Sequence, residues 1–174
     1  EGSNCGLVKN LALSAIISET TKSEDIIEKL YEIGVSHFSD VKPDVQRDGA
    51  RIFVDGKLIG YFNDGENLVK TLRELRRTSK IHSHVGISIH QQDHTDATKR
   101  LYINCNAGRV LRPLIIIKNG KSSLTPDILD KILKNLLSWI DLVRMGIIEL
   151  VDANEEENCF IIFDEKHAKK ATHL

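Results

Sequence analysis

The fold is decided by the stretch Arg51-Ile52-Phe53-Val54-Asp55-Gly56-Lys57-Leu58-Ile59-Gly60-Tyr61. Asp55-Gly56 stands between two runs rich in residues that favour strands. An Asp-Gly pair in that setting is the strongest short-range signal for a hairpin. We therefore predict two antiparallel strands over residues 51–61.

Helical patterns stand on both sides of this hairpin. Apolar residues recur at helical spacing after Ser23, and Gly34 suits a helix end, so we predict a helix over 24–33. A second helix is predicted over about 66–78, with leucines on one face. Four cations would lie roughly opposite, with Arg76 at their edge, and these four are Lys70, Arg73, Arg77 and Lys80.

The remainder predicts further strands and two short helices. Alternating or continuous apolar residues indicate strands at 85–89, 101–105, 110–117, 147–151 and 159–163. The polar run 90–99 is predicted as a loop, helices begin at Pro126 and after Ser138, and residues 152–157 form an acidic turn. This order lacks a regular βαβ alternation. We expect an α+β fold with mixed, mostly antiparallel sheets, amphipathic helices and two small subdomains.

Composition indicates a soluble globular protein. The 174 residues include 24 Lys and Arg against 25 Asp and Glu, for a formal net charge of −1. That balance gives no overall attraction to nucleic acid or to an anionic membrane. Apolar runs fall short of the roughly 18–20 residues that span a bilayer. Three widely spaced cysteines favour a reducing compartment over a disulfide framework. Because no initiator Met or signal peptide is visible, we expect a fragment of a longer polypeptide.

Nucleophilic catalysis is a possible reading of the cysteines. Cys105 and Cys159 stand in apolar strand patterns, and a thiol buried among aliphatic side chains is inert. We therefore predict structural roles for both. Cys5, which is next to a glycine, stays undecided.

Metal and phosphate sites have weak signals. His82, His84, His90 and His94 have ligand-like spacing, but no CxxC or HExxH companion is present, so we expect solvated histidines. The run 120–122 resembles the end of a P-loop without its first glycine, and we predict a turn there.

Charge clusters leave two alternatives open. The basic helix face is either solvated or a docking surface for an acidic partner or for phosphates. The acidic turn is either solvated or a site for a divalent cation. Its carboxylates are Glu149, Asp152, Glu155, Glu156 and Glu157.

Six stretches, in order along the chain, match one family pattern. They are EGSNCGLVKNLAL (1–13), ARIFVDGKLIG (50–60), LRELRR (72–77), NAGRVLRPL (106–114), MGIIELVDANEEEN (145–158) and THL (172–174). Together they resemble the second-largest subunit of multisubunit DNA-directed RNA polymerases, most of all the archaeal form. Asn106 and Leu150 depart from the pattern, where Asp and Tyr are usual. The resemblance covers essentially the whole chain.

The resemblance implies a division of the chain. Residues 1–20 would end the fork region, 21–82 would be the first external domain, 83–163 the second, and 164–174 would lead to a downstream region. The parent enzyme polymerises ribonucleotides on a DNA template. Its magnesium is held by the largest subunit, so we expect no cofactor and no catalytic residue in this fragment.

Partners and location follow from the same resemblance. It implies contact with other polymerase subunits, and with template DNA and RNA in the assembled enzyme, but no membrane. The location would be cytoplasmic, or nuclear for a eukaryotic source.

Site expectations concern three groups of residues. The resemblance places Lys9 and Asn10 closest to nucleic acid, and makes the basic helix face a candidate subunit-docking surface. Arg109 and Arg112 would pair with carboxylates of the acidic turn rather than with phosphates. Because alternate strand residues face opposite sides, we expect only one arginine, Arg112, to reach that turn. The candidate carboxylates are Asp152, Glu155 and Glu156.

Two other classes remain as alternatives. One is a stand-alone protein-binding or regulatory α+β module. The other is an independent Cys/His hydrolase, which a fast-reacting thiol would support.

Overall fold

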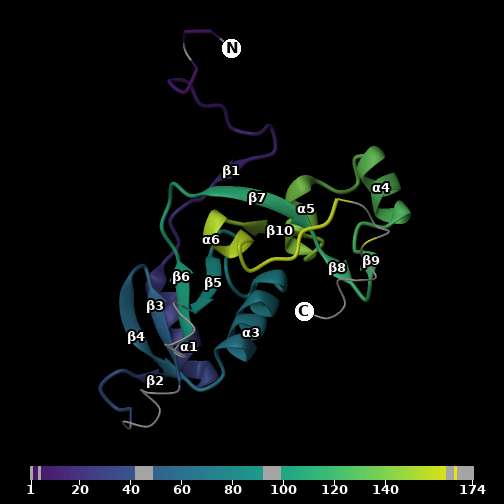
Figure 1. Cartoon of the computed structure of the whole chain (residues 1–174). Helices are drawn as coiled ribbons and strands as arrows, with labels where there is room; N and C mark the ends of the chain where they lie inside the picture. The colour runs from purple at the N-terminus through teal and green to yellow at the C-terminus, as the bar shows by residue number, and fades with distance from the viewer. Residues whose placement is uncertain (1, 4, 42–48, 92–98, 164–166, 168–174) are drawn as a thin grey trace.

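Two sheets and a small hairpin organise the chain (Figure 1). The computed structural model describes residues 2–3, 5–41, 49–91, 99–163 and 167. One sheet has five strands in the order β2-β4-β3-β6-β5, and the other has three in the order β1-β7-β10. All pairings are antiparallel except that of β3 with β6. The expected α+β class is confirmed.

The predicted hairpin forms the middle of the larger sheet. β3 (Ala50–Val54) and β4 (Lys57–Phe62) are joined by Asp55 and Gly56, whose φ angles are 48° and 80°. Two successive positive φ angles are what a tight two-residue hairpin turn requires. The Asp55 carboxylate also accepts a hydrogen bond of 2.7 Å from the Cys105 backbone N–H. This contact ties the turn to the end of the neighbouring strand.

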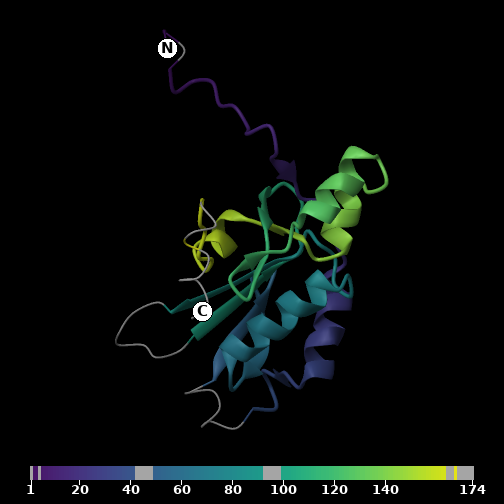
Figure 2. The ribbon, with the colours of Figure 1, turned by 90° about the vertical axis from the view of Figure 1, so that its right-hand side faces the viewer.

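Two helices cover one face of the larger sheet (Figure 2). They are α1 (Ser23–Ile33) and α3 (Gly65–Arg77). Ser23 is the first residue of α1, and Lys22 holds the N-cap position. Gly34 ends the helix, with φ 107°, as predicted. The Asp64 side chain caps α3 by accepting from the Asn67 N–H at 3.0 Å. The first hydrophobic core lies between helices and sheet, and its most buried members include Leu30, Ile52, Leu68, Leu72, Ile87, Leu101 and Ile103.

The remaining strands of this sheet are β2 (Ser36–His37), β5 (Gly86–Gln91) and β6 (Lys99–Asn104). Residues 92–98 of the predicted loop lie outside the described residues. The sheet joins strands from both sides of residue 82. The predicted boundary between the two external domains, at residues 82 and 83, stays a prediction. In the structure, strands from both sides of this boundary pack in one sheet.

The smaller sheet is built around β7 (Val110–Ile115). β1 (Ile16–Ile17) and β10 (Ile148–Val151) pair with it on opposite sides. The predicted strand 110–117 is broken after Ile115, and β8 (Ile117–Lys118) pairs instead with β9 (Lys121–Ser122).

Two helices pack against the smaller sheet. They are α4 (Pro126–Leu133) and α5 (Trp139–Arg144). The predicted helix after Ser138 forms, and Ser138 and Asp141 make a reciprocal capping box at its start. The second hydrophobic core consists of Leu111, Leu142, Ile147, Ile148 and Leu150.

Two local predictions are wrong. The acidic stretch forms a short helix, α6 (Ala153–Glu156), because the Asp152 side chain accepts from the Glu155 N–H at 2.9 Å. No strand forms over 159–163, where Phe160 and Phe163 are 58% and 95% exposed and have no sheet to pair with. Residues 8–12 belong to no helix or strand, and the side chains of Val8 and Leu11 are exposed. Within the described ranges, no helix is long and apolar enough to span a bilayer.

Candidate functional site

An arginine–carboxylate network fills the space between the two cores. Its centre is Glu155, whose side chain is fully buried on α6. Arg76 of α3 donates from Nη1 to Glu155 Oε2 at 2.7 Å and from Nη2 to Oε1 at 2.6 Å. This two-pronged geometry is the strong form of an arginine–carboxylate contact. Arg76 is only 3% exposed, so both charges are removed from water together.

Glu155 has two further donors. Arg73 Nε donates to Oε1 at 3.1 Å, and the backbone N–H of Ile87 donates to Oε2 at 3.1 Å. The capping contact from Asp152 fixes the first turn of α6 and thereby directs Glu155 inward. A buried charge is tolerated only when paired and hydrogen-bonded, and Glu155 meets that condition.

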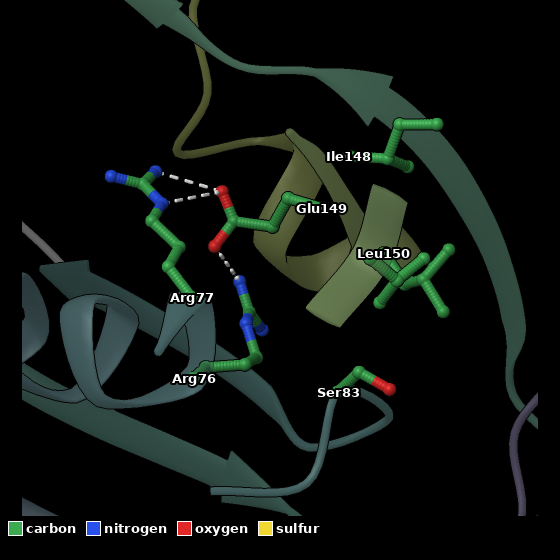
Figure 3. Close-up of a pocket in the computed structure, with 7 residues that line it drawn as sticks. Arg76, Arg77, Ser83, Ile148, Glu149 and Leu150 are labelled. Atoms are coloured by element: carbon green, nitrogen blue, oxygen red, sulfur yellow. Dashed lines mark hydrogen bonds and ion pairs between the residues drawn. The ribbon is translucent and has the colours of Figure 1, made fainter. Parts of the chain in front are cut away.

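Glu149 on β10 links the same helix to the smaller sheet (Figure 3). Arg76 Nη2 donates to its Oε1 at 2.6 Å, and Arg77 Nη2 donates to Oε2 at 2.7 Å. Burial alone would raise the pKa of the Glu149 carboxyl, but Arg76 and Arg77 outweigh it and hold that pKa below the usual range. Burial would likewise lower the pKa of Arg76, and Glu155 and Glu149 reverse that effect and raise it. Both shifts favour the charged forms of Glu149 and Arg76.

Arg109 and Asp152 form a second, partly buried pair. Arg109 Nη1 donates to Asp152 Oδ2 at 2.6 Å, while Nη2 donates to the carbonyls of His84 at 2.7 Å and Asn104 at 2.9 Å. The pair lies against Gly86, where an added Cβ would be 2.2 Å from Asp152 Oδ2 and 2.7 Å from Arg109 Nη1. Only glycine leaves room for this contact.

Both arginines of the 106–114 stretch reach the acidic segment, which corrects the expectation that only Arg112 would. Arg112 Nη1 donates to Glu156 Oε1. Arg109 precedes β7 and follows Gly108, which has φ 84°. Strand alternation therefore does not apply to Arg109. The Arg112 side chain is 46% exposed, so its pair lies at the surface.

The basic face of α3 is divided between surface and interior. Lys70 and Lys80 are exposed, and Arg73 and Arg77 are half-buried in the network. Arg76 is buried, so this member of the candidate face is exposed neither to solvent nor to a docking partner. A docking role for this face stays a prediction.

The other candidate residues lie apart from the network. Lys9 and Asn10 are exposed in the extended N-terminal segment. Burial raises the pKa of the Cys105 thiol to about 11 and also raises that of Cys159, so neither is a ready nucleophile. Cys5 is exposed.

Histidines and carboxylates offer no metal centre in the part of the chain that the structure describes. Burial and the nearby His82 lower the pKa of His84, whose Nδ1 accepts from the Glu19 N–H at 3.1 Å. His94 lies outside the described residues. The acidic segment faces guanidinium groups, which do not fit a magnesium site.

Comparison with known proteins matches two family models along the chain. Residues 52–118 match "RNA polymerase Rpb2, domain 4", and residues 139–173 match "RNA polymerase Rpb2, domain 5". The chain belongs to the family of second-largest RNA polymerase subunits. It is 39% identical over 185 residues to the DNA-directed RNA polymerase subunit Rpo2 of Saccharolobus shibatae, with all of this chain and 16% of that protein covered. The DNA-directed RNA polymerase II subunit RPB2 of Encephalitozoon cuniculi is 34% identical over 166 residues, covering 95% of the chain and 14% of the relative.

This second-largest-subunit chain thus spans about 16% of the length of its archaeal relatives. Three of the stretches that carry the resemblance meet in the network and in the two arginine–carboxylate pairs beside it. Residues 72–77 supply three arginines, 106–114 supply two, and 145–158 supply the carboxylates. The sequence pointed to most of these residues but not to the partners of Arg76 and Arg77.

Proposed function

We propose that this chain is a structural region of the second-largest subunit of a DNA-directed RNA polymerase, an enzyme that makes RNA on a DNA template from ribonucleoside triphosphates. Its role is to hold two hydrophobic cores in a fixed arrangement. The observation that carries this proposal is that the family-pattern stretches converge on one buried ionic network, centred on Arg76 and Glu155.

The physical argument rests on the cost of separating the network. Glu155 is 0% exposed and receives donors from Arg73, Arg76 and the backbone of β5. Removing one partner from such a group leaves a buried charge unpaired, at a cost of about 3–5 kcal/mol. The contacts therefore favour one relative position of the cores. A rigid region of this kind suits a large multisubunit enzyme.

Partners in the assembled enzyme are other polymerase subunits, template DNA and RNA. Lys9 and Asn10 are the candidates closest to nucleic acid, and their exposure supports this role. Lys70 and Lys80 are the exposed members of the candidate subunit-docking face. Catalytic magnesium belongs to the largest subunit in this proposal, so the isolated chain is inactive. The location is cytoplasmic, or nuclear for a eukaryotic source.

A chimaeric enzyme tests the proposal. This chain replaces the matching segment of the Saccharolobus shibatae subunit, and the polymerase is reconstituted and assayed for template-directed RNA synthesis. We expect assembly and transcription. In the same chimaera, Arg76→Ala should reduce the yield of assembled enzyme, whereas Lys131→Ala, an exposed change on α4, should not. A folded chimaera that assembles without transcribing would contradict the proposal.

A further inference from the structure

We propose that the face of the larger sheet opposite α1 and α3 binds single-stranded RNA, with one unpaired base seated against Tyr102. The surface is formed by β3, β6 and β5, which run from the centre of that sheet to one edge. The groups that would recognise the RNA belong to this chain itself, so the inference does not rest on the polymerase assignment.

The two sides of the larger sheet carry different side chains. Helices α1 and α3 pack on one side, where the first hydrophobic core lies (Figure 2). Alternate residues of a strand face opposite sides of a sheet, and buried Ile52, Leu101 and Ile103 face the core. The residues that alternate with them on the three strands face the other side, and none of them is a carboxylate. They are Arg51, Phe53, Ser88, His90, Arg100, Tyr102 and Asn104.

Three rings follow one another across these strands. Phe53 and Tyr102 are register partners on β3 and β6, and their ring centroids are 5.2 Å apart with the planes 20° apart. The ring centroid of His90 on β5 lies 5.8 Å from that of Tyr102, with the planes tilted by 54°. Near-parallel rings at such a distance attract each other. Phe53 therefore holds the Tyr102 ring in place on the sheet.

A hollow lies beside the Tyr102 ring. His90, Arg100, Tyr102 and Asn154 of α6 line this open space of about 410 Å³. A nucleobase seated in the hollow would stack on Tyr102, and stacking on aromatic side chains is how proteins hold unpaired bases. The bases of a duplex are already paired and stacked on one another, so the hollow suits a single strand.

Arginines on the same face supply the charge that a nucleic-acid backbone requires. Arg51 and Arg100 are register partners, two residues before Phe53 and Tyr102 on the same strands. A guanidinium group binds phosphate oxygens through its fork of N–H donors. Glu157 borders the face, with its Oε2 3.9 Å from His90 Nδ1 and its side chain 72% exposed. Positive charge still exceeds negative charge among these residues, although the whole chain has a formal net charge of −1.

Polar groups at the hollow favour RNA over the other candidate ligands. The Tyr102 hydroxyl and the Asn154 amide can each donate and accept hydrogen bonds, and Asn154 is exposed on α6. A ribose 2′-OH also donates and accepts, and it is the group by which a protein distinguishes RNA from DNA. An acidic peptide would contact the arginines but would leave the ring of Tyr102 and the hollow unused.

Fluorescence anisotropy tests the proposal with the 174-residue chain and a labelled single-stranded RNA of about ten nucleotides. We expect the unmodified chain to bind, and the binding to weaken as the salt concentration rises. Tyr102→Leu should weaken the affinity by at least about fivefold, because the stacking ring is lost. The matched control is Tyr31→Leu, an exposed change on α1 at the other side of the sheet, which should leave the affinity unchanged.

A second variant tests the charged part of the surface. Arg51→Gln should lower the affinity and reduce the slope of log K against log salt concentration by about 0.7, which corresponds to one phosphate contact on a single strand. Arg144→Gln, an exposed change on α5, should alter neither quantity. Should circular dichroism show Tyr102→Leu to be unfolded, Asn154→Ala on the surface of α6 replaces it, and it should reduce the preference for RNA over DNA.

Three outcomes would overturn the proposal. The first is no binding at low salt, or the same affinity in Tyr102→Leu as in Tyr31→Leu. The second is equal affinity for DNA of the same base order, which overturns the choice of RNA. The third is polyglutamate that displaces the RNA equally well from the unmodified chain and from Tyr102→Leu, which shows a surface for acidic peptides instead.

Discussion

Arg76 and Glu155 stand 79 residues apart in the chain and form a two-pronged contact, with Nη1–Oε2 at 2.7 Å and Nη2–Oε1 at 2.6 Å. One residue belongs to α3 on the first core, and the other to the helix that follows the smaller sheet. Their side chains are 2% and 0% exposed. The pair therefore makes the position of each core depend on the other.

Removal of the Arg76 side chain should destabilise the chain far more than removal of Arg112. Arg76→Ala removes the two-pronged donor of buried Glu155 and one donor of Glu149, so we expect the first urea transition of the variant to lose about 3–5 kcal/mol in unfolding free energy. Arg112→Ala breaks an exposed pair and should cost under about 1 kcal/mol. Urea denaturation measures both. Equal losses of unfolding free energy in the two variants would contradict the burial of the Arg76 pair and the exposure of the Arg112 pair.

Gly86→Ala should disturb the pair of Arg109 and Asp152. The added Cβ would lie 2.2 Å from Asp152 Oδ2, which forces the carboxylate to move. We expect a loss on the order of 1–3 kcal/mol, as for other overpacked sites. In an Asp152→Ala background the same change should cost less, because the obstructing carboxylate is gone. Thermal melts of the four proteins give the coupling, and strict additivity would refute the steric explanation.

Gly108→Val should be destabilising for a different reason. Gly108 has φ 84°, a conformation that β-branched residues avoid, although nothing lies within 4 Å of a Cβ built there. The expected loss is about 1–3 kcal/mol from backbone strain alone. An unchanged denaturation midpoint would rule out a need for this geometry.

Lowering the pH should reduce the contribution of Glu149 to the free energy of unfolding. Arg76 and Arg77 hold its pKa below the ordinary value, despite burial, so the folded state binds this proton less readily than the unfolded state. The stabilisation is therefore complete above the unfolded-state pKa and is lost as pH falls through the folded-state pKa. The difference in unfolding free energy between the unmodified chain and Glu149→Gln should be largest near neutral pH and narrow in acid. Glu28→Gln, an exposed change on α1, serves as the control.

The three cysteines should differ in their rates of alkylation. Burial raises the pKa of Cys105 to about 11 and raises that of Cys159, so both should react slowly at neutral pH while exposed Cys5 reacts first. Mass spectrometry of the folded chain after brief iodoacetamide treatment gives the order. A fast reaction at Cys105 would revive the hydrolase alternative.

Local signals predicted the elements whose partners are close in sequence. The turn at Asp55-Gly56, the end of α1 at Gly34 and the helix start after Ser138 each depend on a few neighbouring residues. The apolar run 159–163 also looks like a strand locally, but a strand requires a partner, and Phe163 is 95% exposed.

The burial of Arg76 had a signal in the sequence. Leu68, Leu72 and Arg76 follow one another at steps of four, so the arginine lies on the apolar stripe of α3 rather than beside it. Its partners were not predictable, because Glu149 and Glu155 are more than seventy residues away along the chain. The pairing of Arg109 with Asp152 likewise depended on a backbone turn at Gly108 that strand alternation did not anticipate.

The coupling of the two cores is tested most directly by following their unfolding separately. Trp139, the single tryptophan, lies on α5 beside the second core, so its fluorescence follows that core. Hydrogen exchange at Ile52 and Leu101 follows the first. The account predicts that both probes report one urea transition in the unmodified chain and two separate transitions in Arg76→Ala. Coincident transitions in Arg76→Ala at an unchanged midpoint would contradict it.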